Sequence, residues 1–117
     1  MQQEKLKSEI EQIGDVSIIR FNGNLDGLTC LSAQEDLQAL VDGGAKNLLI
    51  NFEAVKFVSS AGLRALLFIG KALKETDGHV GFCAMSETVG QVFRISGFDK
   101  IFEVYTDEID GLDGFQI

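Results

Sequence analysis

The sequence predicts an α/β fold with a mainly parallel β-sheet, and three observations support this class. Short apolar runs alternate with longer segments in which apolar residues recur at helical spacing. The run at residues 48–52 is almost continuously apolar, which is typical of a strand buried on both faces of a parallel sheet. Gly14 and Asp15 separate two short runs near the start, so we expect the sheet to open with an antiparallel hairpin.

The strands are predicted from runs rich in β-branched and aromatic side chains. The clearest run contains Val16, Ile18 and Phe21, and the turn sequence 22–24 follows it. The first run is weaker, because only Ile10 and Ile13 are apolar. The expected strands cover residues 10–13, 16–21, 48–52, 80–85 and 101–105.

The helices are predicted from apolar spacing and from residues that start or end helices. Ser86 can cap a helix at the N–H of Val89, and Gly78 and Gly97 can end helices in the left-handed conformation. The first helix carries these apolar residues at helical spacing: Leu31, Ala33, Leu37, Leu40 and Val41. The expected helices cover residues 30–41, 60–76, 86–96 and 107–115, the last one short and acidic.

The composition limits the domain organisation and the partners. A chain of 117 residues with 45% hydrophobic residues is expected to form a single domain over residues 1–117, with the polar residues 1–7 as a flexible arm. The net charge of −8 argues against nucleic acid and anionic membrane surfaces as partners, because both require a basic surface. A basic protein surface is the more natural complement.

Several features favour a cytoplasmic protein without a cofactor. Cys30 and Cys83 lie among apolar neighbours without metal or redox spacing, so we expect buried thiols in a reducing compartment. We expect neither a secretory signal nor a transmembrane segment. His79 is the only histidine, and Gly70 and Lys71 lie in a helical pattern without a phosphate-binding loop, so no metal site or nucleotide site is predicted.

The sequence 57–67 joins an apolar run to the second long helix through two serines. Ser59 or Ser60 can cap this helix, whose apolar residues Leu63, Leu66, Leu67, Gly70 and Leu73 recur at helical spacing. A phosphate on such a serine would be stabilised by the unpaired N–H groups of the helix start. From this segment alone, a capping role for Ser60 and a packing role for Gly62 are the simpler interpretation.

Asp26 follows the second predicted strand, and Ser60 follows the third strand and the short run 55–58. Loops after parallel strands gather at one edge of a sheet, so Asp26 can lie near Ser60 and help to position its hydroxyl for phosphoryl transfer. The alternative is a turn residue that accepts hydrogen bonds from its own loop. If Ser60 accepts a phosphoryl group, the nucleotide and magnesium belong to another protein.

Three motifs together resemble the STAS domain family, and within it the stand-alone bacterial anti-sigma-factor antagonists. They are residues 21–26 (FNGNLD), residues 47–63 from NLLINF to FVSSAGL, and residues 96–102 (SGFDKIF). The resemblance implies a mixed sheet of about five strands flanked by about four helices, and a regulatory protein that is not an enzyme. It also implies a partner switch. The unphosphorylated antagonist binds an anti-sigma factor that is also a serine kinase supplied with ATP and Mg²⁺, phosphorylation releases it, and a PP2C-type phosphatase resets it.

By position, the resemblance places the phosphorylated serine at Ser60 and the acid of the Gly-x-Leu-Asp motif at Asp26. Ser59 stands where many family members have aspartate, and it becomes the second candidate acceptor. Ala61 stands where serine or threonine is frequent, and Gly62 completes the phosphosite environment. The expected partner-binding residues are Asn24, Asp26, Arg64, Ala65 and Phe68. A solvated rim is the alternative for Arg64 and Phe68.

Two other functions fit the same sequence. The first is a constitutive STAS adaptor, a subunit of a transporter or signalling assembly that is never phosphorylated. The second is a small hydrolase with Ser60 as nucleophile, which lacks a credible base because His79 precedes a different strand.

Overall fold

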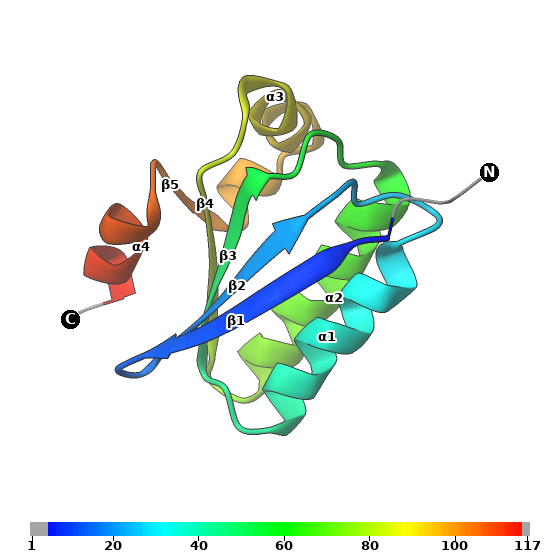
Figure 1. Cartoon of the computed structure of the whole chain (residues 1–117). Coiled ribbons are helices and arrows are strands. Elements are labelled where there is room, and N and C mark those ends of the chain that lie inside the picture. The colour runs from blue at the N-terminus through cyan, green and yellow to red at the C-terminus, as the bar shows by residue number, and fades with distance from the viewer. Residues whose placement is uncertain (1–4, 116–117) are drawn as a thin grey trace.

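The computed structural model describes residues 5–115, which form a five-stranded sheet flanked by helices (Figure 1). The elements along the chain are β1 (Lys7–Ile13), β2 (Val16–Asn22), α1 (Cys30–Asp42), β3 (Asn47–Ala54), α2 (Ser60–Glu75), β4 (His79–Cys83), α3 (Glu87–Ser96), a 3₁₀ turn (Phe98–Lys100), β5 (Glu103–Tyr105) and α4 (Glu108–Phe115). The strand order is β1-β2-β3-β4-β5, with β1 antiparallel to β2 and the later pairs parallel. The predicted α/β class with a mixed, mainly parallel sheet is confirmed.

The sheet separates two apolar clusters of unequal size. α1 and α2 cover one face of the sheet and α4 covers part of the other (Figure 1). The larger cluster contains a series of phenylalanine rings, in which the ring centre of Phe82 lies 5.5 Å from Phe52 and 5.1 Å from Phe93. The smaller cluster lies next to α4 and contains these buried residues: Val16, Ile18, Leu49 and Cys83. Most of the burial that stabilises the fold is therefore on the α1 and α2 face.

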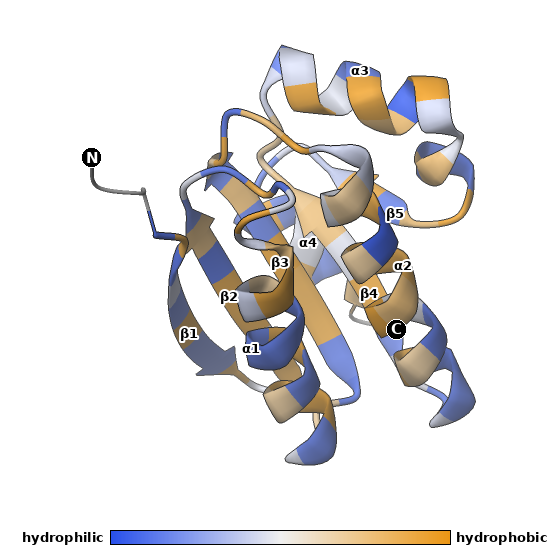
Figure 2. Cartoon of the chain, turned by 90° about the vertical axis from the view of Figure 1, so that its right-hand side faces the viewer, coloured by the Kyte–Doolittle hydropathy of each residue, from blue (hydrophilic) through white to orange (hydrophobic). Residues whose placement is uncertain are grey.

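The hydropathy of the strands follows their place in the sheet. β3 is mostly hydrophobic in Figure 2, and residues 48–52 are all buried, as predicted for a strand covered on both faces. β1 is hydrophilic along much of its length and is exposed at every position, which suits a strand at the sheet edge. Within the described chain, no helix combines the length and apolarity needed to cross a membrane.

Several predicted strand boundaries and one predicted burial are wrong, and β1 and β3 are both longer than expected. Leu6 packs against the larger cluster and Lys7 begins β1, so the arm expected at residues 1–7 does not include these two; residues 1–4 lie outside the described residues. β4 ends at Cys83 because Ala84 turns to a positive φ of 60°. β5 begins only at Glu103, after the 3₁₀ turn. Cys83 is buried as predicted, but Cys30 is only half-buried.

Helix ends were predicted more accurately than strand ends. Ser86 Oγ accepts a hydrogen bond from Val89 N at 3.1 Å, and Gly97 ends α3 in the left-handed conformation with φ of 78°. At the end of α2, however, Asp77 and not Gly78 adopts the positive φ. A Cβ on Gly78 would lie 2.7 Å from Lys46 O, so this glycine is required for a close backbone approach.

Candidate functional site

The loop between β2 and α1, which we call the Leu25 loop (residues 23–29), is bound to the segment that precedes α2. Leu25 N donates a hydrogen bond to Phe57 O, and Ser59 N donates one to Leu25 O, both at 2.9 Å. Leu25 and Val58 thereby continue the parallel pairing of β2 with β3 beyond the strands. The sheet therefore brings the two segments that sequence analysis singled out to one place, as the parallel topology predicts.

Gly62 allows the Leu25 loop to lie in close contact with the start of α2. Gly62 is buried, and a Cβ at this position would lie 2.6 Å from Leu25 O and 3.0 Å from Leu25 Cγ. The packing role considered for Gly62 is thus the one that the contacts support. The glycine faces the Leu25 loop, so it is not available to admit another molecule to the serines.

The two serines at the start of α2 have different surroundings. Ser59 is the N-cap, and its Oγ accepts a hydrogen bond from Gly62 N at 3.3 Å. Ser60 is the first residue of the helix, its side chain is exposed, and no described residue forms a hydrogen bond with its Oγ. Ala61, which follows, is half-buried. The capping role considered for Ser60 therefore belongs to Ser59, and the Ser60 hydroxyl is accessible.

Asp26 shapes the Leu25 loop through its carboxylate. Asp26 Oδ1 accepts hydrogen bonds from Leu28 N at 2.9 Å and from Thr29 N at 3.2 Å. Asn24 takes part through its carbonyl oxygen, which accepts a hydrogen bond from Thr29 Oγ1 at 2.7 Å. The turn role considered for Asp26 is observed, and the loop also brings Asp26 to the α2 start, next to the Leu25 that binds Ser59 N. Both Asn24 and Asp26 are half-buried.

The partner-binding residues predicted on α2 do not all face solvent. Arg64 and Phe68 are exposed, and the Phe68 side chain has a relative accessibility of 52%. Ala65 is only 4% accessible and packs with Gly62 and Ile69 on the buried side of the helix. Its inclusion in the partner-binding face is therefore wrong. The reason is helical geometry, since Ala65 lies three residues after Gly62 and four before Ile69.

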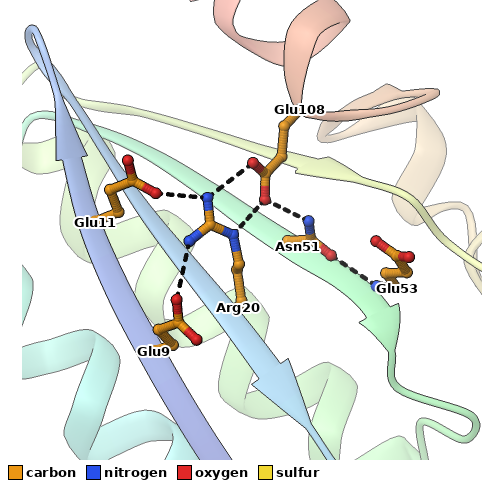
Figure 3. Close-up of polar contacts among 6 residues, drawn as sticks. All are labelled: Glu9, Glu11, Arg20, Asn51, Glu53 and Glu108. Atoms are coloured by element: carbon orange, nitrogen blue, oxygen red, sulfur yellow. Dashed lines mark hydrogen bonds and ion pairs between the residues drawn. The ribbon is translucent and has the colours of Figure 1, made fainter.

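A second polar cluster, which sequence analysis missed, lies on the α4 face of the sheet (Figure 3). The Arg20 guanidinium donates to both carboxylate oxygens of Glu108, from Nε at 2.6 Å and from Nη2 at 2.9 Å. Arg20 also pairs with Glu11 at 2.8 Å and Glu9 at 3.4 Å. Asn51 Nδ2 donates to Glu108 Oε2 at 2.6 Å. The cluster therefore joins the first residue of α4 to the first three strands.

The pKa values in this cluster follow from its hydrogen bonds. The bonds from Arg20 hold the pKa of Glu108 below its usual value, partial burial opposes this shift, and Asn51 reinforces it. The bonds to Glu108 and Glu11 raise the pKa of Arg20, so this ion pair is fully charged near neutral pH. Next to this cluster, burial raises the pKa of the Cys83 thiol to about 12, so the thiol is protonated.

Comparison with known proteins identifies the family. The family model described as the STAS domain matches residues 7–110. The chain belongs to the STAS domain family. BtrV of Bordetella bronchiseptica, provisionally named an anti-sigma factor antagonist, is 30% identical over 99 residues that cover 85% of each chain.

Solved structures of other proteins resemble this chain over nearly its whole length. An anti-sigma factor antagonist from Mycobacterium paratuberculosis has a TM-score of 0.88 and 25% identity, and the match covers 96% of this chain and 95% of that chain. The phosphorylated form of the Bacillus protein SpoIIAA has a TM-score of 0.73 and 22% identity, with 94% of this chain and 100% of that chain covered. The resemblance inferred from the three sequence motifs is thus confirmed.

The STAS domain presents two chemically distinct sites. One is an accessible serine hydroxyl at the start of α2, and the other is a cluster of charges that are already paired. Among the described residues, no group of three His, Cys, Asp or Glu side chains is placed to hold a metal ion.

Proposed function

We propose that this STAS domain is an anti-sigma factor antagonist whose binding to an anti-sigma factor is switched by phosphorylation of Ser60. The observation that carries the proposal is the pair of serines at the start of α2. Ser59 supplies the N-cap, so the exposed Ser60 hydroxyl is not needed for the fold and is free to react. The names of the relatives support an anti-sigma factor as the partner, and the phosphorylated SpoIIAA structure shows that a protein with this fold can carry phosphate.

The partner supplies the kinase activity in this proposal. Ser60 Oγ attacks the γ-phosphorus of ATP bound with Mg²⁺ to the anti-sigma factor, the bond to the β-phosphate oxygen breaks, and ADP leaves. The hydroxyl proton passes to a base of the partner. A PP2C-type phosphatase reverses the modification by hydrolysis. The phosphate adds roughly two negative charges at the site, where the start of α2 stabilises it locally and a docked partner must accommodate it.

The test uses a purified anti-sigma factor of the serine-kinase class from the same organism, with ATP and Mg²⁺. Intact-mass measurement is expected to show the addition of one phosphate to the wild-type chain and to Ser59→Ala, and none to Ser60→Ala. Undiminished phosphorylation of Ser60→Ala would contradict the assignment of the acceptor. If the wild-type chain binds the anti-sigma factor but is never modified, the constitutive adaptor becomes the better description.

A binding measurement tests the switch itself. Titration calorimetry with the nucleotide-free anti-sigma factor is expected to give similar affinities for the wild-type chain and Ser60→Ala, and a weaker affinity for Ser60→Asp. Equal affinities for all three proteins would count against release by added charge.

A further inference from the structure

We propose that four exposed apolar side chains, on the Leu25 loop, the start of α1 and the segment that carries Ser60, anchor the anti-sigma factor, and that a phosphate on Ser60 releases it chiefly through its cost of desolvation. The inference rests on the proposed function for the identity of the partner. The four residues, which we call the apolar patch, are Leu28, Leu31, Phe57 and Phe68. Their relative accessibilities are 74%, 66%, 47% and 52%.

The exposure of Leu28 follows from the turn that Asp26 makes. The carboxylate of Asp26 accepts the N–H groups of Leu28 and Thr29, and within this turn Thr29 points inward at 7% accessibility. Leu25, at the other end of the loop, is completely buried. Leu28 lies between these two buried positions and is left mostly in solvent.

Leu31 is exposed because the opposite side of α1 faces the core. Ala33 and Leu37 are completely buried on that side, whereas Leu31 is 66% accessible. Leu31 contributed to the apolar spacing that predicted this helix, but its side chain does not face the core. A leucine at this degree of exposure in the first turn of α1 contributes little to folding.

The two phenylalanines lie on the segment that contains Ser60. Ser60, Arg64 and Phe68 are all exposed and follow one another at four-residue spacing, so they form one outer stripe of α2. Phe57 precedes the helix, and its carbonyl oxygen holds Leu25 N at 2.9 Å. These contacts join the Leu25 loop with its Leu28 to the segment that carries Ser60.

The charge at this end of the molecule indicates what kind of surface it fits. The segments 25–31, 56–60 and 64–68 contain one acidic residue, Asp26, and two basic ones, Lys56 and Arg64. Their sum is +1, from −1 and +2, on a chain of net charge −8. A basic partner surface, which composition alone suggested, is therefore not required here. The patch fits an anti-sigma factor surface that is apolar and nearly neutral.

This environment determines how a phosphate would act. When the patch is covered, Ser60 lies among apolar side chains from which water is excluded. A dianion at Ser60 would lose its hydration, and Arg64 one turn along α2 and the N–H groups of the helix start would offset only part of that cost in an apolar interface. Release by this route depends little on ionic strength, whereas release by long-range repulsion would weaken as salt screens the charges.

The experiment measures the affinity of the full chain for the purified, nucleotide-free anti-sigma factor. We expect Leu28→Ser and Leu31→Ser each to weaken binding about tenfold or more, as anchor residues do, while thermal unfolding is unchanged. The matched control is Ile95→Ser on α3, a more exposed residue at 81% accessibility, which is expected to change the affinity by no more than about twofold. The ratio of wild-type to Ser60→Asp affinity should stay within about threefold between roughly 50 and 500 mM salt.

The outcomes separate this inference from the proposed function. If Leu28→Ser and Leu31→Ser bind like the wild-type chain while Ser60→Asp binds weakly, the switch stands and the apolar anchor is wrong. If the Ser60→Asp effect vanishes at high salt, the desolvation mechanism is wrong. If the wild-type chain does not bind the anti-sigma factor, the proposed function fails and this inference fails with it.

Discussion

Ser60 and Arg20 lie on opposite faces of the same sheet, and their polar groups are used in opposite ways. Arg20 has its guanidinium paired with Glu108, Glu11 and Glu9 inside the molecule, and Glu108 is also bound by Asn51. Ser60 Oγ, in contrast, is exposed without an intramolecular hydrogen bond among the described residues. A polar group whose partners are internal serves the fold, and one that is exposed without partners is available to another molecule. The comparison assigns stability to the Arg20 face and, in the function that we propose, binding to the Ser60 face.

The largest expected effect tests how the Ser60 face is held together. Gly62→Val would place a branched side chain against Leu25 O, because a Cβ at position 62 would lie only 2.6 Å from that oxygen atom. A backbone oxygen cannot move aside as the end of a flexible side chain can. We expect a loss of about 3 kcal/mol in the free energy of unfolding, measured by urea denaturation. Gly90→Val is the matched control, because the nearest atom to its Cβ is the flexible tip of Arg94 at 3.4 Å. If both variants lose the same stability, the close contact of Gly62 with Leu25 is not what constrains this junction.

Two arginines test the division of roles directly. Arg20→Met would leave Glu108 beside Glu9 and Glu11 without its cation, and we expect a loss of about 1–2 kcal/mol, between the values typical of exposed and buried pairs. Arg64→Met, on the exposed stripe of α2, should change stability by less than about 0.5 kcal/mol. Affinity for the anti-sigma factor should fall more in Arg64→Met than in Arg20→Met. A loss of binding in Arg20→Met without a loss of stability would overturn the comparison.

The pH dependence sharpens the account of the Arg20 face. The pKa of Glu108 is lower in the folded protein than its usual value of 4.5, so the ionised carboxylate stabilises the fold above that pH and loses this contribution as pH falls through the folded-state pKa. Glu108→Gln should therefore cost about 1 kcal/mol near neutral pH, and the difference from wild type should shrink progressively below pH 4.5. Parallel stability curves for the two proteins down to strongly acidic pH would show that Glu108 does not contribute in this way.

The sequence contained enough information for the Ser60 face but not for the Arg20 face. Caps and turns depend on residues close in the chain, so the serines at the start of α2 and the Ser86 cap could be predicted from short motifs. Arg20 and Glu108 are 88 residues apart, and only the folded sheet brings α4 to β2. Arg20 is the one charged residue in the mostly apolar β2, and this signal could have drawn attention to it.

Apolar residues were the other source of error. Ala65 was assigned to the surface with its neighbours Arg64 and Phe68, although its spacing from Gly62 and Ile69 places it on the buried stripe. Leu31 was counted in the apolar spacing that predicted α1, yet it faces solvent. The burial of Ala65 could have been predicted from its spacing, whereas the exposure of Leu31 depends on where the neighbouring loop and helix pack.

The smallest expected effect distinguishes the two adjacent serines. Ser59→Ala removes the acceptor for Gly62 N, and because that bond is 3.3 Å long we expect a loss of only about 0.5–1 kcal/mol. Ser60→Ala removes a hydroxyl without an intramolecular partner and should lie within about 0.5 kcal/mol of wild type. The two substitutions are at adjacent positions, so the difference between their unfolding curves measures the stability contributed by the capping serine relative to that of the exposed serine. Should Ser60→Ala prove the less stable of the two, the cap would belong to Ser60, and its hydroxyl would no longer be free for a partner.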